Sequence, residues 1–291
     1  MASTTYTLSP VNSRPGLFAE LRALVAVFRR EFIIMRRYPS WVIQMVIWPI
    51  IFPAGYVLSG RALAGPDGGG LQLFQQRAGT HDFIGFIAVG TMIWMWQNVV
   101  LWDVGFSLRN EQLRGTLETN WMTPAWRFSF LLGSSLNQML MMSVFLSVAA
   151  MEYVTLFGVR LNGDPFLVLL SFLAAIPSIY GIGMAFSSLV IAAKEAHTFV
   201  QMVRGLVMIF CGITYPIAVM PGWMQGVAAW LPQTYIIHSM RSAILGGADF
   251  QALWPDFRML LIFGAFWLVV GYLTFNWMER RARRNGTLGQ Y

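Results

Sequence analysis

Charged residues are scarce in this sequence of 291 residues: they make up 11% of it, whereas hydrophobic residues make up 56%. A typical soluble domain carries about 25% charged residues. This deficit, together with a mean hydropathy of +0.57, excludes an ordinary soluble domain and indicates an integral membrane protein. No polar stretch is long enough to form a second, soluble domain, so we expect a single membrane domain.

Lysine, cysteine and histidine are also rare, and each scarcity excludes a class of site. A phosphate-binding loop needs the pattern G-x-x-x-x-G-K-[ST], and no glycine precedes the single lysine, Lys194, at that spacing. The chain therefore has no ATPase motif, and we expect no cofactor bound by this chain itself. The single cysteine, Cys211, excludes an internal disulfide. The three histidines are far apart and not at metal-ligand spacing, so we expect no metal site.

Apolar runs account for most of the chain, and six of them are predicted to cross a membrane, which takes about 20 residues. The predicted spans are 41–59, 83–108, 128–157, 166–193, 198–219 and 259–278. Residues 17–38 alternate apolar and basic residues at helical spacing, which is typical of an amphipathic helix in the membrane interface. Residues 220–245 are apolar but interrupted by prolines into pieces too short to span, which predicts a re-entrant or interfacial helix pair.

The predicted fold is therefore an all-α integral membrane domain over residues 17–284. It has six transmembrane helices, an N-terminal amphipathic interfacial helix, and a short re-entrant helix pair between helices five and six. Residues 1–16 are expected to form a mobile polar tail, and residues 285–291 a C-terminal tail. With this topology 15 basic residues fall on one side of the membrane and 5 on the other. Because basic residues concentrate in cytoplasmic loops, we expect both termini in the cytoplasm and the chain in the plasma (inner) membrane.

The most polar internal segment, 109–124, lies between spans two and three and reads RNEQLRGTLETNWMTP. Glu111, Arg114 and Glu118 are three and four residues apart, so in one helix they would share a face and could form ion pairs. A charged helix held between two spans on the basic side suits contact with a soluble partner. The alternative is a loop without a partner, whose charged side chains only keep it solvated.

The order Glu111, Gly115-Thr116-Leu117-Glu118 and Thr123-Pro124 resembles the first cytoplasmic loop of ABC-2 type transporter permeases. The resemblance covers roughly residues 17–280. It implies a homodimeric permease served by two copies of a separate ATPase subunit, which binds ATP and Mg²⁺, with segment 109–124 as the coupling helix. The coupling candidates that it implies are Glu111, Arg114, Gly115, Thr116 and Glu118, followed by Arg29, Arg30 and Glu31 of the amphipathic helix.

Several residues inside the spans are candidates for lining a substrate pathway. A charge within a span is costly and is a functional hypothesis by default, and methionine repacks around varied apolar shapes. The alternatives are packing or lipid contact for the methionines and tryptophans, and a position near interfacial water for the glutamate. The candidates are Trp94, Trp96, Asp103, Met139, Met142, Glu152 and Met208.

The resemblance implies an exporter that moves an amphiphilic or lipid-like substrate, a drug or a lipid, outward across the membrane, along a pathway for which spans two and five are the expected lining. A lipid-linked polysaccharide exporter is the alternative, because Trp94, Trp96 and Trp102 could stack on sugar rings. A membrane-embedded enzyme or assembly factor is a second alternative. It would need polar catalytic groups that converge within the membrane, and the sequence offers no convincing set.

Overall fold

The computed structural model describes residues 16–63, 74, 78, 80, 82–123, 125–192 and 196–285, and every regular element in this part of the chain is a helix. In chain order the elements are α1 Leu17–Arg37, α2 Ser40–Leu63, α4 Phe83–Leu113, α5 Leu117–Met122, α6 Phe128–Phe157, α7 Pro165–Ala192, α8 Ala196–Phe210, the 3₁₀ helix η1 Ile217–Val219, α9 Gly222–Ala228, α10 Pro232–Ile244 and α11 Phe250–Asn285. Of the predicted tails 1–16 and 285–291, only Gly16 and Asn285 are described, and most of the loop after α2 also lies outside the described residues.

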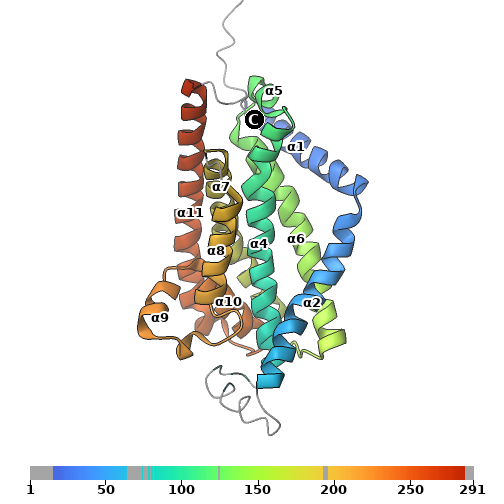
Figure 1. Cartoon of the computed structure of the whole chain (residues 1–291), viewed down its shortest axis with the longest axis vertical. Helices are drawn as coiled ribbons and strands as arrows, with labels where there is room; N and C mark the ends of the chain where they lie inside the picture. Colours follow the sequence, from blue (N-terminus) through green and yellow to red (C-terminus); the bar gives the residue numbers. More distant parts are fainter. Residues whose placement is uncertain are drawn as a thin grey trace, which may run out of the picture.

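Helix α4 occupies the centre of the bundle, with α6 and α2 on one side and α7 and α8 on the other (Figure 1). In its most apolar stretch 83% of the residues are buried, compared with 22–50% in the other four long apolar helices. This explains why α4 can carry polar side chains such as Gln97, Asn98 and Asp103 along an otherwise apolar sequence. They face protein or an internal space rather than lipid.

Among the described residues, five helices are long and apolar enough to cross a membrane: α2, α4, α6, α7 and α11. The predicted span 198–219 is helical only as far as Phe210, so its predicted C-terminal boundary is wrong. Gly212 adopts a left-handed conformation (φ 66°), and Pro216 has no N–H to continue a helix. With 15 residues, α8 is about 22 Å long, which is shorter than the apolar core of a bilayer.

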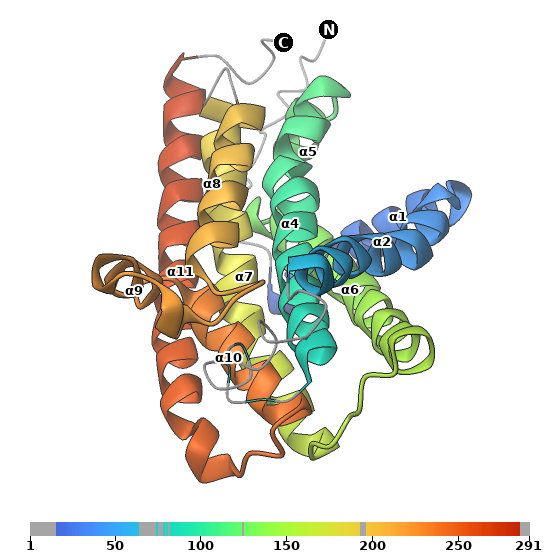
Figure 2. The same ribbon diagram turned by 60° about the horizontal axis from the view of Figure 1, so that its bottom comes forward.

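The first turns of α1 and the last turns of α11 lie at the same end of the molecule, beside α5, while α9 and α10 lie at the opposite end (Figures 1 and 2). Side-chain contacts agree, because Glu20 of α1 and Glu279 of α11 both reach the segment just after α5. If the start of α1 and the end of α11 lie on the same side of a membrane, the chain between them has to cross the membrane an even number of times. The short helix α8 descends beside α7 and supports the predicted sixth crossing, although the count of six remains a prediction.

The prolines divide the region after α8 as predicted. Pro221 and Pro232 stand at the starts of α9 and α10, which both fall within the predicted helix pair 220–245. Arg241 of α10 donates hydrogen bonds to the carbonyl oxygens of Phe86 (3.1 Å), Gly212 (2.7 Å) and Ile213 (2.6 Å). Arg241 therefore satisfies backbone groups that the end of α8 leaves open and ties them to α4.

Small residues allow close packing between α7 and α11, the most extensive helix pair in the structure. A Cβ atom at Gly181 would lie 2.7 Å from the carbonyl carbon of Trp267, and 2.8 Å from the nitrogen of Leu268. Close backbone contact favours helix association in a membrane, because lipid tails are as apolar as the side chains and the hydrophobic effect does not drive the helices together.

Replacing Gly181 with alanine is expected to push α7 and α11 apart and to destabilise the chain by about 1–3 kcal/mol, since the backbone of α11 cannot move aside locally. Thermal unfolding of the purified chain in detergent measures the effect. Gly105→Ala is the matched control, because its Cβ would be 3.6 Å from the nearest atom, Phe186 Cδ1, and the change should be neutral or slightly stabilising. Equal melting temperatures for the two variants would contradict this account.

His238 of α10 forms an ion pair with Asp256 of α11, with 2.6 Å between Nδ1 and Oδ2, at the end of the molecule that holds α9 and α10. The hydrogen bond to Asp256 raises the pKa of His238. A raised folded-state pKa means that this pair stabilises the fold fully below the unfolded pKa, about 6.5, and that the contribution is lost as the pH rises through the folded value.

We therefore expect His238→Gln to lower the melting temperature more at pH 5.5 than at pH 9. Thermal unfolding of both chains across that range measures the difference. A gap that stays constant with pH would show that the ion pair does not contribute through its charge.

Candidate functional site

The predicted coupling segment is two helices, not one. Helix α4 continues to Leu113, and Gly115 then adopts a left-handed conformation (φ 70°). The Gly115 N–H donates to Gln112 O and the Thr116 N–H donates to Glu111 O, each at 3.0 Å, which is the Schellman arrangement that ends a helix. The expectation that Glu111, Arg114 and Glu118 share one helical face is therefore wrong, because Glu118 belongs to the separate six-residue helix α5.

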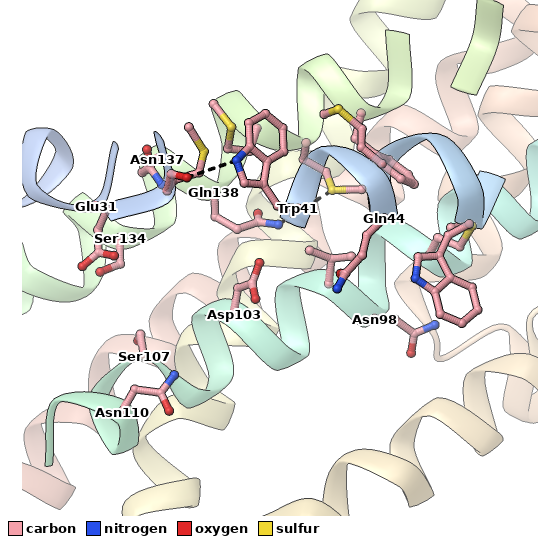
Figure 3. A pocket seen from close by; sticks show the side chains of 18 of the residues that line it. Glu31, Trp41, Gln44, Asn98, Asp103, Ser107, Asn110, Ser134, Asn137 and Gln138 are labelled. Atoms are coloured by element: carbon pink, nitrogen blue, oxygen red, sulfur yellow. Dashed lines mark hydrogen bonds between the residues drawn. The ribbon is translucent and has the colours of Figure 1, made fainter. Parts of the chain in front are cut away.

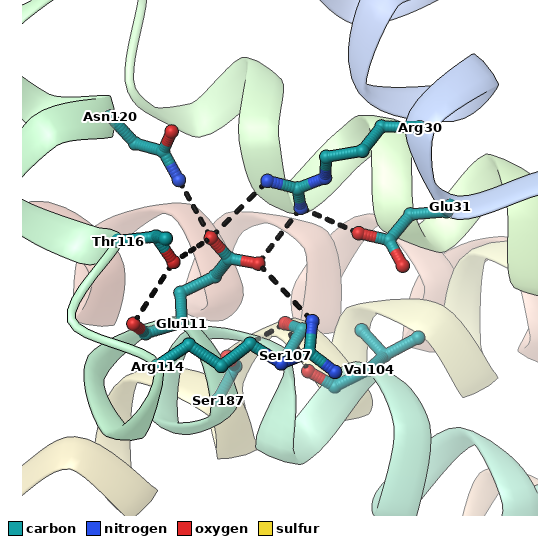
Figure 4. A network of polar contacts seen from close by, with 9 residues as sticks. All are labelled: Arg30, Glu31, Val104, Ser107, Glu111, Arg114, Thr116, Asn120 and Ser187. Carbon is teal, nitrogen blue, oxygen red and sulfur yellow. Dashed lines mark hydrogen bonds and ion pairs between the residues drawn. The ribbon is translucent and has the colours of Figure 1, made fainter. Parts of the chain in front are cut away.

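Glu111 is the centre of a polar network that joins three helices (Figure 4). Arg30 of α1 donates to both carboxylate oxygens, at 2.9 and 3.2 Å. Thr116 Oγ1 and Asn120 Nδ2 each donate to Glu111 Oε2 at 2.7 Å, and Arg114 lies 3.9 Å from Oε1. Because the carboxylate is buried and accepts hydrogen bonds from several donors, Glu111 holds α1, α4 and α5 together.

A second set of contacts fastens the segment after α5 to the rest of the bundle. The carboxylate of Glu20 in α1 accepts hydrogen bonds from the Trp126 N–H, at 2.9 Å, and from Ser129 Oγ, at 3.1 Å, at the start of α6. Arg127 pairs with Glu279 of α11 and donates to the carbonyl of Trp121. The sequence analysis missed Glu20, Asn120, Arg127 and Glu279. Glu20, for example, precedes Trp126 by 106 residues, so no sequence pattern near either residue indicates the contact.

The other coupling candidates divide by exposure. Arg29, Arg114, Gly115, Thr116 and Glu118 are exposed, and α5 turns its apolar side chains Leu117 and Trp121 inward. Glu31 is half-buried and lies 2.5 Å from Arg30, within the same network. The structure therefore brings Arg30, Glu31, Glu111, Arg114 and Thr116 together, and leaves Glu118 and Arg29 free to meet a partner at this end of the molecule.

A cavity of about 670 Å³ opens between the α1–α2 pair and the helices α4 and α6. The residues of α4 that line it recur at steps of mainly three and four, as on one face of a helix: Trp94, Met95, Asn98, Val99, Asp103, Ser107, Asn110, Glu111 and Arg114. Figure 3 shows Trp41 and Gln44 of α2 and Gln138 of α6 around the Asp103 carboxylate. Glu31, Glu111 and Arg114 line the cavity too, so its wall and the network around Glu111 share residues.

One end of the cavity is aromatic. Phe52 of α2 contacts the ring of Trp94, with centroids 5.0 Å apart, and Trp48 contacts Phe52 at 5.4 Å. The guanidinium of Arg204, the residue through which α8 lines the cavity, lies 5.3 Å from the Trp94 ring centroid. The cavity is thus acidic and polar towards α5, and aromatic towards the middle of α4.

The structure places three of the seven pathway candidates on this cavity: Trp94, Asp103 and Met142. Trp96 is fully buried and stacks on Phe172, with centroids 4.8 Å apart. Met208 accepts a hydrogen bond from Tyr56, and Met139 packs against the core. Glu152 is buried away from the cavity, near the other end of α6. Asn98, Trp41 and Gln138 were missed, since amides and interfacial tryptophans are common in spans and do not stand out by pattern.

Replacing Glu111 with alanine would leave Arg30, Thr116 and Asn120 without their shared acceptor. We expect a loss of stability of about 1–3 kcal/mol and faster amide hydrogen exchange over α5. Thermal unfolding and exchange mass spectrometry measure the two effects. Glu118→Ala is the control, since an exposed side chain outside the network should change stability by no more than about 0.5 kcal/mol. Unchanged exchange over α5 in Glu111→Ala would contradict the fastening role.

Comparison with known proteins agrees with this architecture. A family model described as "ABC-2 family transporter protein" matches residues 66–273, a range that contains α4 to α10 and most of α11. No curated protein was found to match the chain. The matched range includes Glu111, α5 and the α4 and α6 walls of the cavity, while α1 and α2 precede it. The chain belongs to the ABC-2 transporter family and is a membrane permease component of an ABC transporter.

Proposed function

We propose that this chain is the membrane-spanning permease subunit of an ATP-driven exporter that moves an amphiphilic or lipid-like substrate outward across the plasma membrane. A separate ATPase subunit supplies the energy by binding and hydrolysing ATP with Mg²⁺. Two copies of the chain pair with two ATPase subunits, and the end of the molecule that holds α5 faces the cytoplasm. The excess of basic residues on that side and the family of the chain support this orientation.

The observation that carries the proposal is the double role of Glu111. Its carboxylate fastens α5 to α1, and the same side chain lines the cavity. A partner that pushes on the exposed face of α5, at Glu118, therefore displaces groups that form the cavity wall. Because donors from α1 and from the start of α5 converge on Glu111 of α4, these three helices move as one unit instead of bending separately.

The cavity favours an amphiphile over a polysaccharide as the substrate. Its volume of about 670 Å³ is in the range of sites for drug-sized ligands, about 300–1,000 Å³. Of the three tryptophans that kept the polysaccharide alternative open, only Trp94 lines the cavity, since Trp96 stacks on Phe172 and Trp102 stacks on Phe106. Family membership argues against the embedded enzyme or assembly factor.

Exposed apolar side chains on α2, α8 and α11 supply the surface for membrane lipids and for the second copy of the chain. Examples are Ile43, Ile51, Met202, Leu261 and Leu273, each at least 54% exposed. A band of this kind is costly in water and ordinary in a bilayer or at a subunit interface.

Purification of the chain from its native membrane in mild detergent is expected to recover an ATPase subunit in equal amount, identified by mass spectrometry. Glu118→Arg should reduce that recovery, or abolish export-linked ATP hydrolysis, since reversing an exposed charge at a docking face changes association without unfolding the spans. Asp249→Arg reverses another exposed acidic charge, in the loop before α11, and should have no effect. Full recovery and normal export with Glu118→Arg would refute the docking role of α5.

A further inference from the structure

We propose that the cavity between α2, α4 and α6 binds an organic cation with an apolar body, and that Asp103 receives its positive charge. This names the substrate class of the exporter and rests on the proposed function for its physiological meaning. The inference begins with the one acid in the cavity that the surrounding helices leave unneutralised.

Asp103 lies on the cavity face of α4, three turns of helix from its end, and its carboxylate is accessible from the cavity (Figure 3). Among the described residues, none donates a hydrogen bond to Asp103 or pairs with it. A carboxylate within a span is costly unless a partner compensates its charge, so acids in spans are kept where they serve a ligand, an ion or a proton. The position therefore calls for a positive group that the chain does not supply.

The other charges around the cavity strengthen this preference. Glu31 is a second acid on the wall, and its negative charge acts on Asp103. The basic residues are engaged elsewhere: Arg114 lies beside Glu111, at 3.9 Å, and Arg204 donates to Gln201 at 3.1 Å and covers the Trp94 ring. Trp94 precedes Asp103 by nine residues, which is about 13 Å along the helix axis. Arg204 therefore lies at the far, aromatic end of the cavity. Glu31 and Glu111 are already paired with Arg30, which leaves Asp103 as the acid on this wall that has no basic partner among the described residues.

The walls fit the rest of such a ligand. Trp41, Met45, Met142 and Phe145 line the cavity with Asp103, and methionine adapts to varied apolar shapes. Aromatic faces also attract organic cations through their quadrupoles. Burial of an apolar body against these side chains favours a cation with hydrocarbon or aromatic groups over a hydrated inorganic ion, which would retain its water.

A second, independent feature marks the cavity as a binding site. Asn98 lines it, is only 8% exposed, and has both its amide oxygen and its amide nitrogen without a partner among the described residues. A buried amide with neither group paired costs free energy that a ligand can recover. Asn98 is therefore in place to hydrogen-bond a polar group on the ligand, about one turn and a half of helix away from Asp103.

The test compares tetraphenylphosphonium with tetraphenylborate, two ions of nearly the same shape and opposite charge. The full chain in phosphatidylcholine nanodiscs is dialysed against each ion, and binding to empty nanodiscs is subtracted. We expect saturable binding of the phosphonium only. Asp103→Asn should weaken it about tenfold or more, since a nearby opposite charge at low effective dielectric is worth at least that factor. Asp103→Glu, which keeps the charge, should retain most of the affinity.

Asp249→Asn is the matched control, because it removes an exposed acid outside the cavity and should leave binding unchanged. Thermal unfolding of each variant verifies that the fold is intact. Equal binding of both ions by the wild-type chain would overturn the proposal. So would unchanged phosphonium affinity in Asp103→Asn, or equal affinity losses in Asp103→Asn and Asp103→Glu.

The measurement separates this inference from the proposed function, since no ATPase is present. A chain that binds phosphonium through Asp103 but recovers no ATPase would keep the cation site and refute the exporter. A chain that recovers its ATPase but does not distinguish the two ions would keep the exporter and refute the cation site.

Discussion

The arrangement of the polar end of this molecule depends on one buried carboxylate. Glu111 accepts hydrogen bonds from Arg30, Thr116 and Asn120, and so joins α1, α4 and α5. Burying a charge costs several kcal/mol unless hydrogen bonds and an opposite charge compensate it, and here both do. The same side chain lines the cavity, so a single residue links the contacts of α5 to the wall of the space between α2, α4 and α6.

The apolar core of a bilayer offers no water to pair with backbone groups, and this constraint accounts for two further features of the fold. Where α8 stops, the carbonyls of Gly212 and Ile213 would be left open in an apolar setting, and Arg241 from α10 supplies the donors. Where α7 meets α11, Gly181 lets the two backbones approach closely, since van der Waals contact takes the place of the hydrophobic effect between membrane helices. Asn98, whose amide oxygen and nitrogen are both without a partner among the described residues, and Asp103, which has no partner there either, both line the cavity, which is why it is interpreted as a ligand site.

Local pattern was enough for much of the helical framework. The boundaries of α6 agree with the predicted 128–157, and the prolines marked the starts of η1, α9 and α10. Pattern failed at two helix ends. The predicted span followed the apolar run to Val219, but α8 ends at Phe210, before the left-handed Gly212 and Pro216. Arg241, about 30 residues later in the chain, then satisfies the carbonyls that are left open. The helical spacing of Glu111 and Glu118 suggested one helix, but Gly115 ends α4 and Glu111 turns inward towards Arg30.

Hydrophobicity, proline and basic residues act locally along the chain, so the amino-acid sequence was enough to predict a membrane protein, most of its helices, an uneven distribution of basic residues and a resemblance to the family. Which polar residues join helices and which line a cavity followed from the packing of the helices and could not be predicted from the sequence. Arg30 and Glu111 are 81 residues apart, and Asp103 shares its cavity with Trp41 and Gln138 from two other helices. Such juxtapositions arise from the packing of helices, which a local pattern cannot specify.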